Sequence, residues 1–221
     1  MTELFLHHHL GLGDHIICNG LVRYLSQTNL IKLFCKTHNI NNVKQMYLDN
    51  HNIDLIDVYN DNEAEKIGLT NKENYIRIGV ALNGNWPPQM EESWDRVFYY
   101  QLNIPYEYSW SLFKYNRPSS IQNIVPNNNY AFICNKGSDG QDRIDYSKID
   151  TSLQKVYSDQ GGFFDNLDLI TNATEIHCVN SSYIHFIDRI TTSNNTILFY
   201  HKNFKFKRHG EFSLKKDWNI V

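Results

Sequence analysis

Short apolar runs and helix-spaced apolar positions alternate along the first half of the chain. Runs at residues 4–6, 31–35, 53–59 and 75–82 are rich in aliphatic and aromatic residues, which predicts strands. After the first run, Ile17, Leu21 and Leu25 recur at helical spacing, and a shorter helical stretch follows at 43–48. Strands that alternate with helices predict right-handed crossovers and therefore a parallel sheet.

The same alternation returns after a stretch of turn-forming residues. Residues 119–129 contain a Ser pair, Pro126 and three consecutive Asn residues, a composition typical of a linker. Before this linker, apolar positions at 91–102 also recur at helical spacing, which predicts a helix. Beyond the linker, strands are predicted at 130–135, 175–179 and 196–200, and helices at 164–172 and 182–190. We therefore expect an α/β protein of two small Rossmann-like halves, 1–118 and 130–221, each with a parallel sheet.

Composition argues against several classes of protein. The 221 residues are 41% hydrophobic, enough for a core, and the net charge of −3 argues against binding to a nucleic-acid phosphate backbone. No apolar stretch approaches the roughly 18 residues of a membrane span, and the N-terminus lacks a signal-peptide pattern. The four cysteines are far apart and form no Cys-x-x-Cys pair, so neither a zinc site nor a disulfide framework is expected. We expect a reduced, cytoplasmic protein.

The first candidate for chemistry is the turn between the first strand and the first helix. Gly11 and Gly13 let the backbone turn tightly and approach a ligand, and Asp14 follows them. The dinucleotide fingerprint would need a third Gly where Ile16 stands, and the Lys-Ser/Thr of a nucleotide P-loop is missing. What remains is a carboxylate at the carboxyl end of a strand, where α/β folds place their ligand cleft. The alternative is that Asp14 only caps its helix.

Histidines surround this turn. His7 and His9 fall on one face of the predicted strand, and His15 is close in sequence. No nearby set of acidic or Cys residues completes a metal site with known spacing, so we expect no metal and assign these histidines to structural or substrate contacts.

The second candidate is the segment that follows the strand predicted at 175–179. Asn180, Ser181 and Ser182 lie where that strand leads into a helix. Small hydroxyl side chains and open N–H groups at a helix start can bind an anion. Ordinary capping of the helix by Ser181 or Ser182 is the alternative.

In combination, these two blocks resemble the GT-B glycosyltransferases, specifically the ADP-heptose transferase family. That family has a Gly-Asp turn after its first strand and, in its second domain, a block in which Asp-Ser/Thr-Gly is followed by His three positions after the Gly. Asn180 stands where the family has the Asp. The resemblance implies two Rossmann-like domains that face each other across a cleft, in a compact version of the fold.

The resemblance also implies roles for residues of this chain. Asp14 matches the proposed catalytic base. The residues that match or adjoin the donor-binding positions are Gly11, Gly13, Lys136, Ser138, Asn180, Ser181, Ser182 and His185. His9 and His15 are the expected acceptor contacts, and Lys136 or Arg143 would help the second-domain helix to hold the leaving diphosphate.

The activity implied is inverting, metal-independent transfer of a hexosyl or heptosyl group. A nucleotide-sugar would be the co-substrate, with no further cofactor, and a glycan or glycolipid would be the acceptor. Neither a nucleic-acid partner nor a membrane span is expected, and peripheral membrane contact stays open. Two alternatives also stay open: a non-catalytic GT-B-like module that binds nucleotide or glycan, and a nucleotide-sugar epimerase or hydrolase on the same scaffold.

Overall fold

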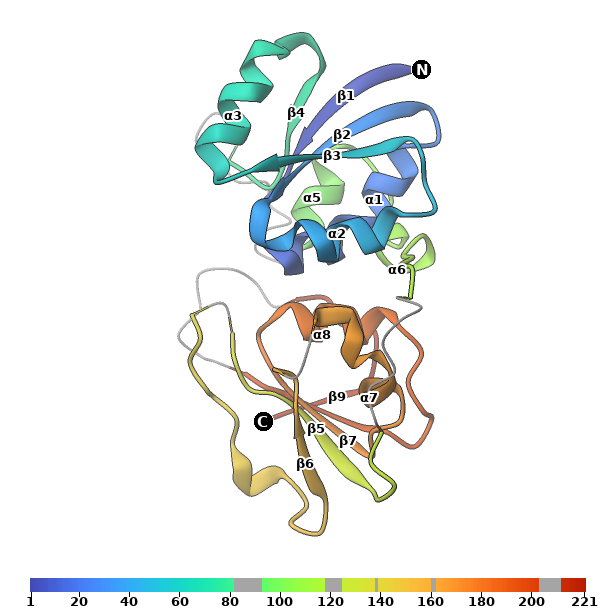
Figure 1. Cartoon of the computed structure of the whole chain (residues 1–221), viewed down its shortest axis with the longest axis vertical. Coiled ribbons are helices and arrows are strands. Elements are labelled where there is room, and N and C mark those ends of the chain that lie inside the picture. Colours follow the sequence, from blue (N-terminus) through green and yellow to red (C-terminus); the bar gives the residue numbers. More distant parts are fainter. Residues whose placement is uncertain (82–92, 118–124, 138, 160–161, 203–211) are drawn as a thin grey trace. The chain divides into compact units, whose positions relative to one another are not determined.

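The chain folds into two compact α/β units. The structure, a computed structural model, describes residues 1–81, 93–117, 125–137, 139–159, 162–202 and 212–221. Unit 1 comprises Met1–Asn116 and Arg208–Ser213, and unit 2 comprises Arg117–Lys207 and Leu214–Val221. The predicted α/β class with two parallel sheets is confirmed (Figure 1).

Unit 1 is built on a four-stranded parallel sheet in the order β3-β2-β1-β4. Its elements are β1 Thr2–His7, α1 Leu12–Leu25, β2 Asn29–Lys36, η1 Thr37–Asn39, α2 Ile40–Tyr47, β3 Ile53–Val58, α3 Asp61–Thr70, η2 Lys72–Asn74, β4 Tyr75–Arg77, α5 Arg96–Tyr100 and α6 Tyr108–Ser111. Helices α1 and α2 lie on one face of the sheet and α3 lies on the other (Figure 1). Apolar side chains on both faces are buried, as expected for a parallel sheet between helices.

A glycine lets two helices of unit 1 approach closely. A Cβ on Gly20 of α1 would lie 1.8 Å from the backbone oxygen of Tyr108, at the start of α6. In an open helix, Ala is more stable than Gly by about 1 kcal/mol. We expect the reverse here: Gly20→Ala should lower the free energy of unfolding by about 1–3 kcal/mol, because backbone has to move. Denaturant unfolding measures this difference, and an unchanged or raised midpoint would contradict the packing.

Unit 2 contains a five-stranded parallel sheet in the order β6-β5-β7-β8-β9. Its elements are β5 Tyr130–Cys134, η3 Tyr146–Lys148, β6 Gln154–Tyr157, η4 Phe163–Asn166, α7 Leu167–Thr171, β7 Glu175–Val179, α8 Ser182–Arg189, β8 Ile197–His201 and β9 Trp218–Ile220. Strand β9 is fixed by Asp188 of α8, whose carboxylate accepts from the backbone N–H groups of Lys215 and Lys216 and from the Trp218 indole.

The two faces of this second sheet are covered differently. Helices α7 and α8 pack on one face, where Phe163, Tyr183 and Phe186 form an aromatic cluster. On the other face, the connection from β5 to β6 contains a 3₁₀ turn and no α-helix among its described residues. Ile144 and Ile149 of this connection pack onto the sheet instead.

The observed elements correct several predicted boundaries. The predicted helix 91–102 is described from residue 93, and only Arg96–Tyr100 is helical there. The strand predicted at 75–82 ends at Arg77. Of the linker predicted at 119–129, residues 119–124 lie outside the described residues and 125–129 belong to unit 2. Phe212 and Ser213 belong to unit 1, although the second domain was predicted to span 130–221. The Ser213 hydroxyl lies 3.0 Å from Ser93 Oγ of unit 1, a pairing that no local pattern encodes.

Candidate functional site

Each sheet has one point where the order of its strands reverses. In unit 1, the chain passes from β1 to β2 and β3 on one side of β1, and then returns to place β4 on the other side. The point of reversal therefore lies between the carboxyl ends of β1 and β4. In unit 2 the corresponding point lies between β5 and β7. Ligands of open α/β sheets bind at such switch points. The predicted turn before α1 and the predicted turn before α8 each lie at the switch point of their own sheet.

The first of these places contains the Asp14 cluster, which we define as His9, Asp14, Gly79 and Trp94. The Asp14 carboxylate accepts hydrogen bonds from the Gly11 backbone N–H and from the Trp94 side chain. His9 Nε2 lies 2.6 Å from the Gly79 carbonyl oxygen, and the rings of His9 and Trp94 are 5.0 Å apart. These contacts connect the carboxyl ends of β1 and β4 with the segment that leads into α5.

Gly79 is required by the geometry of this cluster. Its φ is +75°, in the region that favours glycine, and a Cβ there would lie 2.3 Å from Phe98 and 2.8 Å from the His9 ring. Neither Gly79 nor Trp94 was predicted as a site residue; Trp94 lies within the segment 91–102 that was predicted to be helical. The break that a Gly makes in the apolar run at 75–82 was the signal for the first of them.

Burial raises the pKa of Asp14 to about 6, and the nearby His9 and the two hydrogen bonds act in the opposite direction. Asp14 is the third residue of α1, and its bond to the N–H of Gly11, the N-cap, is one half of a capping box. The capping alternative therefore describes part of what Asp14 does. A carboxyl group with a pKa near 6 can also accept and release a proton near neutral pH.

The other histidines of this region are buried. His15 is fully buried and its ring lies edge-on to His8, with 4.4 Å between ring centres. Burial lowers the pKa of His8 to about 4 and that of His15 well below its usual value. His7 bonds to Tyr75 and Asp61. Of the two histidines expected to contact an acceptor, only His9 is part of the Asp14 cluster, and a buried His15 does not present its ring to a ligand.

The second place is the α8 turn, which we define as Asn180, Ser181 and Ser182. Ser181 is the N-cap of the eight-residue α8, but its side chain makes no capping hydrogen bond. Its Oγ is buried and has no hydrogen-bond partner among the described residues. The capping alternative therefore does not account for this hydroxyl. His185, one turn further along α8, is buried, which lowers its pKa to about 3 and separates it from any ligand at the turn.

The segment after β5 approaches the α8 turn. A Cβ on Gly137 would lie 3.1 Å from the Asn180 carbonyl oxygen, so these two switch-point segments touch. Lys136 is exposed, with its ammonium 4.0 Å from Asp159. The predicted Ser138 lies outside the described residues. Arg143, an expected phosphate contact, pairs with Asp139 through both terminal nitrogens.

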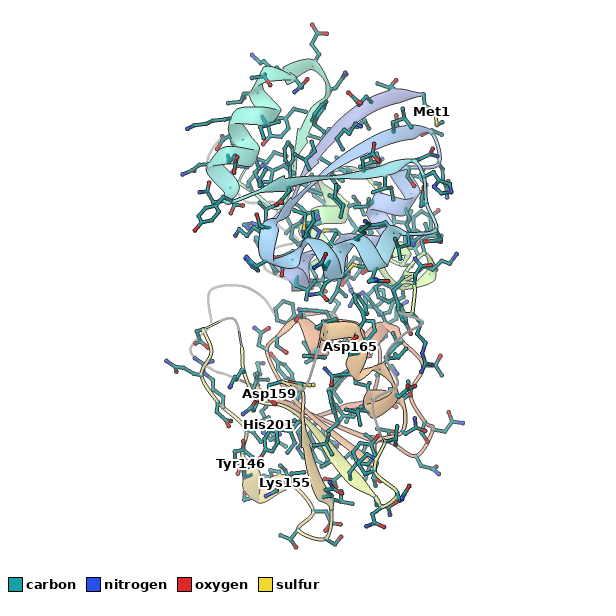
Figure 2. The ribbon with its side chains drawn as sticks, in the orientation of Figure 1. Met1, Tyr146, Lys155, Asp159, Asp165 and His201 are labelled. Carbon is teal, nitrogen blue, oxygen red and sulfur yellow. The ribbon has the colours of Figure 1, made fainter. Side chains whose placement is uncertain are left out.

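A buried polar chain in unit 2 has no counterpart in the sequence analysis. The Asp145 N–H donates to His201 Nδ1 at 3.0 Å, so His201 carries its proton on Nε2 and donates to His177 Nδ1 at 3.0 Å. His177 in turn donates from Nε2 to Glu175 at 3.0 Å. One backbone donor thus fixes both tautomers. The chain joins β7 and β8 to the connection that carries Lys136, and Figure 2 labels His201 next to this sheet.

Comparison with known proteins adds no family to this geometry. None of the helices in the described part of the chain is both long and apolar enough to cross a membrane. No family model, curated protein or solved structure matches the chain.

Proposed function

We propose that the chain is an inverting, metal-independent glycosyltransferase that uses a nucleotide-sugar donor and a glycan or glycolipid acceptor. The observation that carries the proposal is the Asp14 carboxyl group, which lies at the switch point of unit 1 and has a pKa raised to about 6. A general base works best when its pKa lies near the working pH. With a pKa of about 6, Asp14 is mostly ionised at neutral pH and can therefore accept a proton there.

In the proposed reaction, Asp14 takes the proton of an acceptor hydroxyl while the oxygen attacks the anomeric carbon. The bond from that carbon to the donor phosphate breaks on the opposite face, so the configuration inverts. The leaving diphosphate carries the negative charge and binds the open N–H groups of the α8 turn, the Ser181 hydroxyl and Lys136.

A second candidate is a module that binds a nucleotide or glycan without catalysis. The bond from the Gly11 N–H to Asp14 favours it, because a capping role alone would explain why an acid occupies this position. Both candidates need a ligand at a switch point, so binding of a nucleotide alone does not separate them. Formation of a glycoside product, and its dependence on Asp14, does.

The first experiment is a thermal-shift screen against nucleoside diphosphates and their sugar conjugates. A ligand at 100 times its dissociation constant stabilises the folded protein by about 2.7 kcal/mol. For a chain of this length we expect Tm to rise by about 5–10 °C with one nucleotide class. The same donor is then incubated with candidate acceptors, and products are identified by mass spectrometry.

A matched variant locates the binding. Ser181→Ala should reduce the ligand-induced rise in Tm, because it removes a hydroxyl from the α8 turn. The Tm without ligand should stay close to that of the parent, since this hydroxyl has no partner to lose among the described residues. An undiminished rise would place the nucleotide elsewhere, and no rise with any nucleotide would contradict the proposed donor.

A further inference from the structure

Unit 1 contains a pocket at the end of α1 that is remote from Asp14. Its volume is about 450 Å³, within the range of small-molecule sites. It is lined by residues 23, 26 and 27 at the end of α1, by 50 and 52 before β3, and by 111–114 at the end of α6 and just after it. Asp14 lies at the other end of α1, and a helix of this length spans about 20 Å. The pocket is therefore separate from the Asp14 cluster.

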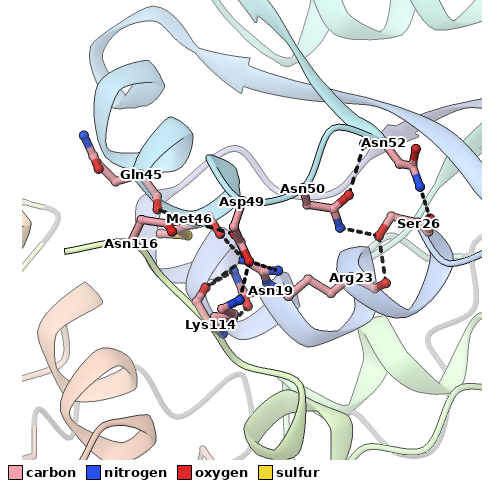
Figure 3. A network of polar contacts seen from close by, with 10 residues as sticks. All are labelled: Asn19, Arg23, Ser26, Gln45, Met46, Asp49, Asn50, Asn52, Lys114 and Asn116. Carbon is pink, nitrogen blue, oxygen red and sulfur yellow. Dashed lines mark hydrogen bonds and ion pairs between the residues drawn. The ribbon is translucent and has the colours of Figure 1, made fainter. Parts of the chain in front are cut away.

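One wall of the pocket consists of amide and hydroxyl groups that are held in place (Figure 3). Asn50 Nδ2 donates to Ser26 Oγ at 2.8 Å, and Ser26 Oγ donates to the Arg23 carbonyl oxygen at 2.8 Å. Asn52 Nδ2 donates to the Ser26 carbonyl oxygen at 3.0 Å, and its backbone N–H donates to Asn50 Oδ1. These contacts also satisfy carbonyl groups at the C-terminus of α1. The wall is thus pre-organised, which reduces the entropy lost when a ligand binds.

Some hydrogen-bonding capacity of this wall is unused. An amide side chain has two donors and an acceptor with two lone pairs. Asn52 uses one donor, and the exposed Gln27 side chain makes no hydrogen bond to a described residue. On the other side, Leu112 and Phe113 supply apolar surface. A ligand with both hydroxyl groups and an apolar face matches this combination.

The two cations beside the pocket, Arg23 and Lys114, both pair with one carboxylate, that of Asp49. Arg23 binds the Asp49 carboxylate through both terminal nitrogens, at 2.7 and 3.3 Å, and Lys114 Nζ lies 2.6 Å from it (Figure 3). The hydrogen bond from Arg23, followed by those from Lys114 and Asn116, holds the pKa of Asp49 well below its usual range. Asp49 therefore stays ionised and occupies both cations. An anionic ligand would have to compete with it, whereas a neutral ligand would not.

We propose that this pocket binds a neutral saccharide. The fixed amides would donate to and accept from neighbouring hydroxyl groups, and Phe113 would cover the C–H face of the sugar ring. The choice of a saccharide among neutral hydroxylated ligands rests on the proposed function. The pocket would hold a part of the glycan that is remote from the reacting hydroxyl, as an ancillary subsite of unit 1.

The test is a titration of ¹⁵N-labelled protein with glucose, galactose, N-acetylglucosamine and maltose, monitored by NMR. We expect at least one of these sugars, at millimolar concentration, to shift the side-chain amide signals of Gln27 and Asn52. Gln27→Ala and Phe113→Leu should each weaken its binding by about fivefold or more, the equivalent of about one lost hydrogen bond. Gln154→Ala removes an exposed Gln from an edge strand of unit 2 and should leave binding unchanged.

Three outcomes would overturn this inference: no shift with any of the four sugars, equal shifts with inorganic phosphate, or binding that Gln27→Ala and Phe113→Leu leave intact. The failure of the proposed function is seen separately. Asp14→Asn should retain saccharide binding at this pocket, so a loss of transfer with retained binding concerns Asp14 alone. Binding of a sugar here without any glycoside product would support the pocket and contradict the transferase.

Discussion

Replacing Asp14 by Asn is expected to slow the proposed sugar transfer by about 10²–10⁴-fold, the usual contribution of a general base. The Asn amide has almost the same shape and can still accept from the Gly11 N–H, but it cannot take a proton. Binding of the nucleotide to unit 2 should change little. The measurement is the rate of glycoside formation at saturating donor, with the thermal shift by the nucleotide as the check that the donor still binds.

Unit 2 offers a matched control for the capping role of Asp14. Asp165 also occupies the third position of a helical turn, and its Oδ2 accepts from the N–H of the N-cap Gly162 at 2.6 Å. A Cβ on Gly11 would lie 2.7 Å from Asp14 Oδ2, and one on Gly162 would lie 2.8 Å from Asp165 Oδ2, so each carboxylate lies close to the glycine at its N-cap. Asp165→Asn should leave the transfer rate within about twofold of the parent, since it alters a cap and no base.

The pH dependence of the rate gives an independent check. Because burial raises the pKa of Asp14 to about 6, the ionised base is lost as pH falls through that value. The transfer rate of the parent should therefore drop by up to about tenfold per pH unit below pH 6. The residual rate of Asp14→Asn should lack this dependence. Equal rates for the parent and for Asp14→Asn would remove Asp14 as the base and favour the binding module.

Much of the sheet framework could be predicted because its strands are buried on both faces. Such strands are continuous apolar runs, and the predicted 175–179 coincides with β7 while 53–59 extends one residue beyond β3. The turns at Gly11–Asp14 and at Asn180–Ser182 follow directly from where those strands end. The alternation of strands and helices implied that both turns lie at the carboxyl ends of strands. That these ends are switch points follows only from the strand order, β3-β2-β1-β4 in unit 1, which requires contacts that the sequence does not reveal.

The elements that the sequence analysis missed bury little apolar surface. Helix α3 buries only Ala64 and Gly68, so its apolar stripe is weak, although the capping pair Asn60 and Glu63 marked its start. Strands β6 and β9 are short and lie at the sheet edges. Edge strands need only one buried face, and their alternation over three or four residues cannot be told from a loop.

The surroundings of several site residues could not be predicted either, because they come from segments that are distant in the sequence. His15 was predicted to contact a ligand because it is polar and lies near a turn, but its position on α1 places its ring in the core against His8. The partner of Asp14, Trp94, is 80 residues away, and the His177–His201 pair comes from separate strands. Local pattern gives the position of a residue along an element. Its burial and its partners depend on tertiary packing.

Acidification should destabilise the protein strongly. Burial lowers the pKa of His8 to about 4 and of His185 to about 3, whereas an unfolded chain has a His pKa of about 6.5. Between these pKa values, the unfolded state therefore binds protons at His8 and His185 that the folded state does not bind. The free energy of unfolding is therefore highest above pH 6.5 and decreases as the pH falls below that value. At pH 5 each of these two histidines should reduce the free energy of unfolding by about 2 kcal/mol relative to neutral pH.

Asp14 acts in the opposite direction and sets the net effect in unit 1. Its raised pKa means that its ionised form costs stability at neutral pH, and protonation below pH 6 should return about 1 kcal/mol. Asp14 belongs to unit 1 and does not offset the effect of His185, which belongs to unit 2. The free energy of unfolding of unit 2 should therefore fall more. Denaturant unfolding at pH 7 and pH 5 measures the change, and His185→Leu should reduce it by about 2 kcal/mol. A free energy of unfolding that is flat or rises between pH 7 and pH 5 would mean that His8 and His185 are accessible to protons in the folded protein.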